Sequence, residues 1–151
     1  MSEFIDYSVG IPYGDFDGKI TASSEYSVNH SVLGCKLGKD RPNPNHVAAW
    51  CAKSEDKFPW IQVEFPKPLT LSAVSIQGRG DCNQYVTRFR VLVSDDGRAF
   101  MNTCEFPGNT DNTTPVTRPF PRPVRARFAR IQILEYVIHP SLRFDFRYIP
   151  E

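Results

Sequence analysis

Two stretches of the sequence concentrate polar side chains that can bind hydroxyl groups. The candidate ligand-binding residues are Asn29, His30, Asn45 and His46 in the stretch 24–49, and Arg79, Asp81, Asn83, Gln84 and Tyr85 in the stretch 78–86. Planar amide, carboxylate and guanidinium groups can each bind two neighbouring hydroxyls, and an aromatic ring can cover the weakly apolar face of a sugar. Because turn geometry also favours Asn and Asp, no single residue is decisive. As groups, the two stretches predict a binding site for a carbohydrate or for a polar protein surface.

The three histidines, His30, His46 and His139, do not belong to a catalytic motif. The sequence contains neither GxSxG nor HExxH, the patterns that place a nucleophile or a metal beside its base. The pair Gly78 and Gly80 precedes a predicted strand rather than a helix, so it does not form a phosphate-binding loop. We therefore predict a binding protein without catalytic residues.

The four cysteines, Cys35, Cys51, Cys82 and Cys104, are widely spaced and form no CxxC pair, which argues against a zinc site. Residues 1–18 carry acidic side chains and lack the apolar segment of a signal peptide. No apolar stretch approaches the roughly 20 residues of a membrane-spanning helix. We therefore expect four free thiols, no membrane insertion and a cytoplasmic location, with unconventional secretion left open.

The composition favours an all-β domain. The chain has 151 residues, enough for one core, and contains 13 prolines, 11 phenylalanines and 6 tyrosines. Prolines at this density break long helices, whereas aromatic residues favour short strands. The formal net charge is only +1, so we expect no nucleic-acid partner. An arginine cluster within 118–130 remains a second candidate surface for a protein contact.

Alternation of apolar and polar residues predicts strands over 19–23, 60–65, 69–76, 85–94, 99–104, 116–120, 127–134 and 142–149. A turn at Asp95-Asp-Gly97 predicts a hairpin between the fourth and fifth of these strands. The predicted core comprises Trp60, Val74, Ile76, Phe89, Val91, Phe128, Ile131, Leu142 and Phe144.

The order of several short stretches resembles the coagulation factor 5/8 type C family, also called discoidin domains. The matching stretches are Ile20-Thr-Ala-Ser-Ser24, Ala49-Trp50, Trp60-Ile-Gln-Val-Glu-Phe65, Val74-Ser-Ile-Gln-Gly-Arg-Gly-Asp81, Val86-Thr-Arg-Phe-Arg-Val91, Ser94-Asp-Asp-Gly97, Ala126-Arg-Phe-Ala-Arg-Ile131 and Ser141-Leu-Arg-Phe-Asp-Phe146. The stretch 77–87 is most similar to the discoidin lectins of slime moulds, which carry Arg-Gly-Asp in the same loop. The resemblance divides the chain into an N-terminal extension, 1–14, and a discoidin domain, 15–151.

The resemblance implies a jelly-roll-like β-sandwich of about eight antiparallel strands that binds ligands through loops at one end. Ligands of the family are galactose-type sugars, glycoproteins, collagen and anionic phospholipid head groups, and the resembled members are not catalysts. A carbohydrate-binding lectin is therefore the leading hypothesis, and an intracellular adaptor that binds a protein is the alternative. Phospholipid binding is less favoured because the loops are mostly polar. The oligomeric state stays open.

Two family features are missing from the sequence. Neither end of the chain has the cysteine that closes many secreted members, and 33–40 lacks the Asp-Gly pair that holds calcium in many sugar-binding members. Asp145 matches a family acidic residue near that site and is the one calcium candidate, but without the Asp-Gly pair we expect no cofactor. Arg79-Gly80-Asp81 also spells an integrin recognition tripeptide, although three residues are a weak signal. We favour a structural or ligand-contact role for these three residues.

Overall fold

A computed structural model describes residues 7–10 and 18–150 of the chain, and within them strands predominate. The elements are β1 (Tyr7–Ser8), β2 (Lys19–Ala22), the short 3-10 helices η1 (Val28–His30) and η2 (Val32–Gly34), β3 (Trp50–Cys51), β4 (Trp60–Gln77), β5 (Tyr85–Ser94), β6 (Met101–Pro107), β7 (Val116–Val137) and β8 (Ser141–Ile149). All pairings between these strands are antiparallel, and the strand order is β1-β8-β4-β7-β5-β6. The predicted all-β, jelly-roll-like sandwich of about eight strands is confirmed.

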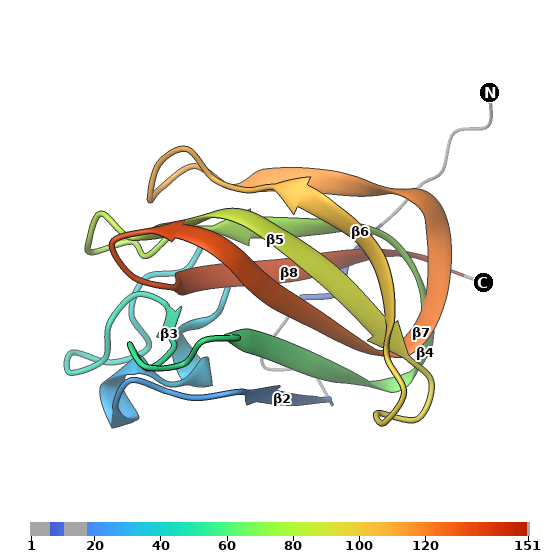
Figure 1. The fold of residues 1–151 in the computed structure, drawn as a ribbon, viewed down its shortest axis with the longest axis horizontal. Coiled ribbons are helices and arrows are strands. Elements are labelled where there is room, and N and C mark those ends of the chain that lie inside the picture. Colours follow the sequence, from blue (N-terminus) through green and yellow to red (C-terminus); the bar gives the residue numbers. More distant parts are fainter. Residues whose placement is uncertain (1–6, 11–17, 151) are drawn as a thin grey trace.

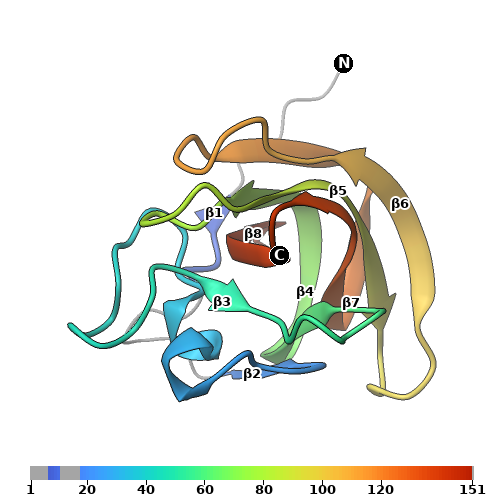
Figure 2. The same ribbon diagram turned by 60° about the vertical axis from the view of Figure 1, so that its left-hand side comes forward.

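Two long strands, β4 and β7, belong to both layers of the sandwich (Figure 1). The first part of β4, 60–64, pairs with β2 and with 128–132 of β7. After a shift in register, 69–77 pairs with β8 and with the first part of β7. The strands therefore turn round a common interior, as the end-on view in Figure 2 shows.

Prolines mark the irregular points of these two strands. Pro66 and Pro68 lie in β4 where the register shifts between Glu64 and Leu69, and Pro121 and Pro123 lie in the part of β7 that has no partner opposite β4. Proline has no N–H to donate to a strand ladder, so it is tolerated where the ladder is interrupted. The sequence-based division into separate strands at 60–65 and 69–76, and at 116–120 and 127–134, is therefore wrong, because each pair is continuous.

The core lies between the layers and contains most of the predicted residues. Val74, Ile76, Phe89, Val91, Ile131, Leu142 and Phe144 are all buried. Trp60 and Phe128 are only partly buried, so their prediction as core residues is wrong. On β4 the inward residues begin at Ile61, which leaves Trp60 on the outer face beneath the guanidinium of Arg130, 4.1 Å from its ring centroid.

Phe128 also packs on the outside of the sandwich, against the turn between β5 and β6. A Cβ added to Gly97 would come within 2.9 Å of the Phe128 ring, and Gly97 has a φ of +77°, which favours glycine. The predicted hairpin of β5 and β6 is confirmed by their antiparallel pairing.

The N-terminal strand β1 extends the sheet beyond β8, where Tyr7 pairs with Tyr148 and Ser8 with Arg147. Part of the predicted extension, 1–14, thus contacts the domain, while 1–6 and 11–17 lie outside the described residues. In the described part of the chain, no helix has the length and hydropathy of a membrane span.

Candidate functional site

The loops that hold the predicted site residues gather at one end of the sandwich, on the left in Figure 1. The segment between β2 and β3 carries η1 and η2, and it lies beside the loop between β4 and β5 and the turn between β7 and β8. We call this surface the loop end. The strands position it because β4, β5, β7 and β8 all begin or finish there.

Arg79 and Asp81 form an ion pair with each other across Gly80. Arg79 Nε donates to Asp81 Oδ1 at 2.8 Å, and Arg79 Nη2 donates to Asp81 Oδ2 at 3.4 Å. The two side chains are only 16% and 18% exposed. Because each binds the other, the Arg-Gly-Asp sequence forms a closed clasp rather than an extended tripeptide.

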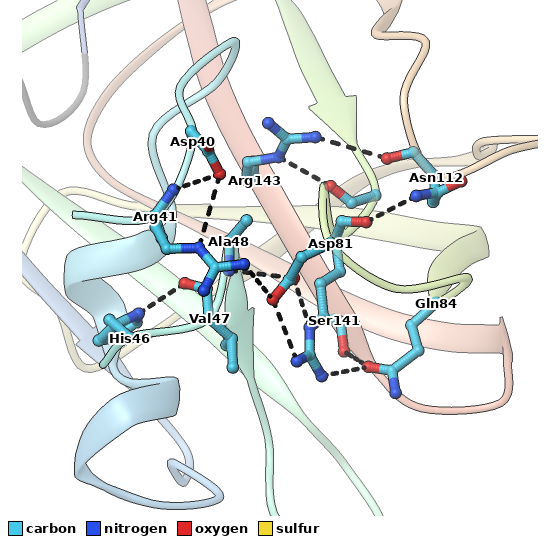
Figure 3. A network of polar contacts seen from close by, with 12 residues as sticks. Asp40, Arg41, His46, Val47, Ala48, Asp81, Gln84, Asn112, Ser141 and Arg143 are labelled. Carbon is cyan, nitrogen blue, oxygen red and sulfur yellow. Dashed lines mark hydrogen bonds and ion pairs between the residues drawn. The ribbon is translucent and has the colours of Figure 1, made fainter. Parts of the chain in front are cut away.

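The clasp of Arg79 and Asp81 joins the loop 78–86 to the loop 24–49 (Figure 3). Asp81 Oδ1 accepts from the Ala48 N–H at 3.2 Å, and Asp81 Oδ2 accepts from Arg41 Nη2 at 3.4 Å. The Gly80 N–H donates to the Ala48 carbonyl at 3.1 Å. The loops 24–49 and 78–86, which were predicted to form one site, are therefore in direct contact.

Gln84 links the clasp to β8. The Arg79 N–H donates to the Gln84 carbonyl at 2.9 Å, which closes the loop. Gln84 Oε1 accepts from Arg79 Nη1 at 3.3 Å and from Ser141 Oγ at 2.9 Å. In Figure 3 the amide nitrogen of Gln84 points away from these contacts, which leaves it placed as a donor.

A buried guanidinium, that of Arg143, holds three loops together. It donates to the carbonyls of Gly78 at 2.8 Å, Lys39 at 2.7 Å and Asn112 at 3.4 Å. Asn112 Nδ2 in turn donates to the Arg79 carbonyl at 3.0 Å. Sequence reasoning missed Arg143 as part of the site, although its long polar side chain on a strand of buried residues was a usable signal.

The hydrogen bonds of the clasp shift the pKa values of Arg79 and Asp81. Burial opposes the charged form of Asp81, but hydrogen bonds from Arg79 and Ala48 outweigh it and lower the pKa of Asp81. Burial similarly opposes the charge of Arg79, and the hydrogen bond to Asp81 overcomes it and raises the pKa of Arg79. Both groups are therefore charged at neutral pH.

His46, predicted as a ligand contact, is inside the loop, with 1% of its surface exposed. The Ser31 N–H donates to His46 Nε2 at 3.0 Å, so this nitrogen accepts and Nδ1 carries the proton that binds the Val47 carbonyl at 2.6 Å. Both ring nitrogens are thus used within the loop. His46 shapes the loop and is not placed to touch a ligand.

His30 lies at the surface of the loop end, in an aromatic cluster with Tyr26 and His139. The ring centroid of Tyr26 is 4.8 Å from that of His30 and 5.4 Å from that of His139, both edge to face. Ser27 Oγ accepts from the Asn29 N–H at 3.1 Å and lies 2.6 Å from His30 Nδ1. The contact with Ser27 therefore occupies Nδ1 and fixes the orientation of the His30 ring.

Sequence reasoning also missed the apolar part of this surface. Tyr26, Val28 and Ile138 are 53%, 83% and 69% exposed. Ile138 has a φ of +69°, a strained conformation for a β-branched residue, and the His139 N–H closes the turn by donating to the Val137 carbonyl at 2.8 Å. A bulky aromatic residue within an otherwise polar loop was the available signal for Tyr26.

The remaining predicted residues differ in their placement. Asn29 is partly buried, and its carbonyl accepts from the Val47 N–H at 2.9 Å. Asn45 and Asn83 are exposed. Tyr85, predicted as the stacking ring, is partly buried at the start of β5, where it pairs with Val137. Among the aromatic rings of the three segments that form the loop end, that of Tyr26 is therefore the most exposed.

The calcium candidate Asp145 lies in β8 and serves the N-terminal strand. Its carboxylate accepts hydrogen bonds from Ser8 Oγ, from the Gly10 N–H at 3.0 Å and from the Phe146 N–H at 2.8 Å. In the part of the chain that the structure describes, no cluster of His, Cys, Asp and Glu is suited to a metal ion. Calcium requires several oxygen ligands, whereas two of these three neighbours are N–H donors, so this environment does not fit the ion.

Sequence comparison identifies the family of the chain. The model of the F5/8 type C domain matches residues 19–146, which is most of the chain. The chain belongs to the F5/8 type C (discoidin) family. Domains of this family are non-catalytic binding modules, so the prediction of a binding domain that is not an enzyme is confirmed for this domain.

Relatives of the chain in the F5/8 type C family include proteins of a slime mould, the group of organisms to whose lectins the sequence is similar. A discoidin-1 polypeptide from Dictyostelium discoideum is 31% identical over 133 residues, covering 84% of this chain and 53% of the relative. The structure of discoidin II from the same organism matches with a TM-score of 0.80 at 26% identity, covering 89% of this chain and 55% of that one. The chain thus spans about half the length of these relatives.

The F5/8 type C fold also matches a bacterial module. The family 32 CBM (carbohydrate-binding module) of NanJ from C. perfringens, solved in complex with galactose, has a TM-score of 0.73 at 18% identity. The match covers 95% of this chain and 99% of that module. At this identity the similarity concerns the fold.

Proposed function

We propose that this F5/8 type C domain is a non-catalytic module that binds a galactose-type sugar, free or on a glycoprotein, at the loop end of the sandwich. The observation that carries the proposal is the exposed ring of Tyr26, in contact with His30, at the loop end that also holds the side chain of Gln84 in place. A sugar needs both, because its hydroxyls form hydrogen bonds while its C–H face packs on an apolar surface.

The polar half of the proposed site consists of groups whose orientation is already set. Gln84 is fixed through Oε1 by Arg79 and Ser141, so its amide nitrogen is the remaining donor. His30 is fixed through Nδ1 by Ser27, so Nε2 is the ring nitrogen that it offers to a ligand. A ligand that binds these groups has to order few side chains, which lowers the entropic cost of binding.

The apolar half of the proposed site is Tyr26 with the neighbouring turn at Ile138. His139 contacts the Tyr26 ring, and its Nε2 lies 2.6 Å from the Ala52 carbonyl, which ties the turn to the end of β3. The strained backbone of Ile138 keeps a large apolar side chain in solvent. Such strain persists when the surrounding structure requires it and often occurs at binding sites.

The comparisons support a sugar as the ligand. A module of the same fold was solved in complex with galactose, and another from C. perfringens was solved with GalNAc-β-1,3-galactose. Both are less than 25% identical to this chain, so they support the class of ligand and not the contacts. The contacts proposed here rest on the geometry of the loop end.

A glycan array followed by titration tests the proposal. We expect binding to galactose-terminated glycans, with and without calcium. Gln84→Ala should weaken binding roughly 2- to 10-fold through the lost hydrogen bond, and Tyr26→Ala by a similar factor through the lost stacking. Tyr7→Ala is the matched control, because Tyr7 is 50% exposed on β1, away from the loop end. Equal weakening by Tyr7→Ala and Tyr26→Ala, or no binding to any glycan, would show the proposal to be wrong.

A protein partner is the second candidate, and the exposed apolar side chains of Val28 and Ile138 favour it. Apolar residues at the centre of a surface are typical of protein interfaces. Under this alternative, deglycosylation of a captured partner leaves its affinity unchanged, whereas sugar binding requires the affinity to fall.

A further inference from the structure

The charges in the polar network around Asp81 are not balanced. One carboxylate, that of Asp81, contacts two guanidinium groups: Arg79 from its own loop and Arg41 from the preceding loop. The polar network of Figure 3 also contains Arg143, which donates to backbone carbonyls, and Asp40, beside Arg41. Three arginines therefore face two carboxylates in this network, which leaves one positive charge in excess.

The ionisation of His30 supports a positive field on the same surface. Burial lowers the pKa of His30, and the next cause is the positive charge of Arg79, which outweighs the opposing effect of Asp81. The Asp81 carboxylate thus does not cancel the field of Arg79 at the position of the His30 ring. An anion bound at this position would gain from that field.

Of the three arginines in this network, Arg41 is the one best placed to meet a ligand. Its side chain is 43% exposed, and it reaches Asp81 through a single hydrogen bond of 3.4 Å, from Nη2. Asp81 also binds Arg79 at 2.8 Å and the Ala48 N–H at 3.2 Å, so it keeps partners when Arg41 turns away. Arg79, by contrast, uses Nε, Nη1 and Nη2 within the protein.

From these observations we propose that the loop end selects acidic saccharides, and that Arg41 sets this selectivity by binding the carboxylate or sulfate of the sugar. The inference rests on the proposed carbohydrate site and specifies the class of ligand. A guanidinium binds either group through two parallel N–H donors, so carboxylate and sulfate share one recognition chemistry. A neutral sugar offers Arg41 no group that could replace its contact with Asp81.

The test compares sugars that differ only in the acidic group. Methyl galactoside, methyl galacturonide and methyl galactoside 6-sulfate are titrated into the full chain by calorimetry at low and at high salt. We expect at least one acidic sugar to bind roughly 10-fold more tightly than methyl galactoside at low salt, since hydrogen bonds to charged groups are the stronger ones. The preference should shrink at high salt, because Arg41 is half-exposed and screened.

Variants of Arg41 separate its role from a general effect of charge. In Arg41→Gln the ratio of acidic to neutral affinity should fall to about 1, and Arg41→Lys should restore part of the ratio. Arg122→Gln, which removes the same charge from an exposed position of β7 outside the network, should leave the ratio unchanged. Thermal unfolding of each variant verifies that it is folded.

Three outcomes overturn the inference. If all three sugars bind equally, the domain is a carbohydrate-binding module without acidic selectivity, and the proposed function stands. If Arg41→Gln and Arg122→Gln lower the ratio equally, the preference arises from overall charge and not from Arg41. If none of the sugars binds and a glycan array is empty, the proposed function fails together with the inference.

Discussion

Arg143 Nε donates to the carbonyl of Gly78 at 2.8 Å, so a strand residue near the C-terminus holds the point where β4 leaves the sheet. The contact is close, because Gly80 approaches the same guanidinium and a Cβ there would lie 3.3 Å from Arg143 Nη2. Burial lowers the pKa of Arg143, which reflects how far its charge is withdrawn from water. The buried guanidinium of Arg143 thus holds the loops of the loop end in place.

Arg143→Met should destabilise the domain by about 2–4 kcal/mol, because the carbonyls of three loops lose a charged donor. For a domain of this size the melting temperature should fall by roughly 4–16 °C, measured by thermal circular dichroism. Arg122→Met, at an exposed position of β7, serves as the control and should stay within about 0.5 kcal/mol of the parent. Equal melting temperatures for Arg143→Met and the parent would contradict this role.

The closed clasp predicts that the folded domain does not support integrin binding through Arg79-Gly80-Asp81. Arg79 and Asp81 bind each other and are mostly shielded, whereas a receptor must reach both side chains. A linear peptide of residues 77–83, in which the pair is open, should compete for an RGD-binding integrin ectodomain in a plate assay. The folded protein should not compete at the same concentration, and competition by both would refute the prediction.

Sequence patterns predicted the strands well because alternation reports burial directly. They misplaced Trp60 because Trp60 and Ile61 are consecutive apolar residues, so either phase of the strand fits the pattern until the register with β7 is known. Prolines were taken as breaks between strands, although Pro66 and Pro68 lie within β4. Local rules describe one strand at a time and cannot show where a neighbouring ladder is interrupted.

The two loops of the site were predictable from the sequence, but the side-chain contacts that join them were not. The contact of Arg79 with Asp81 spans two residues and agrees with the structural role that the sequence suggested for the tripeptide. The contacts of Arg41 with Asp81 and of Arg143 with Gly78 join residues 40 and 65 positions apart, which only the fold brings together. His46 was predicted as a ligand contact because it lies in a polar loop, and its partner Ser31 is a distant member of the same loop.

The cysteines should react with a thiol reagent in two classes. In the described structure all four are free, and Cys35 and Cys51 are buried while Cys82 and Cys104 are partly exposed. Burial raises the pKa of Cys51 to about 11, so only about 0.1% of it is thiolate at pH 8. Titration of the native protein with Ellman's reagent at pH 8 should therefore be fast for two thiols and slow for the others.

Denaturation without a reducing agent provides the control for this thiol titration. All four cysteines should then react at similar rates, because burial no longer protects Cys35 and Cys51. A total of two reactive thiols would indicate a disulfide and would contradict the expectation of four free thiols.

The ionisation of Asp81 should make stability depend on pH in the acidic range. The folded state holds the pKa of Asp81 below its ordinary value, because hydrogen bonds from Arg79 and Ala48 outweigh the effect of burial. A carboxylate with a lowered pKa in the folded state contributes stability that is fully present above the pKa of the unfolded chain, roughly 4. That contribution is lost as the pH falls through the lower, folded-state pKa, where the unfolded chain already binds the proton.

In urea unfolding followed between pH 7 and pH 2, the parent should therefore lose more stability than Asp81→Asn below about pH 4. The two curves should run parallel above about pH 5, where Asp81 is charged in both states of the parent. Asp95→Asn, at an exposed position in the turn between β5 and β6, is the control and should follow the parent throughout. Parallel curves for the parent and Asp81→Asn over the whole range would show that the clasp does not stabilise the charged form of Asp81.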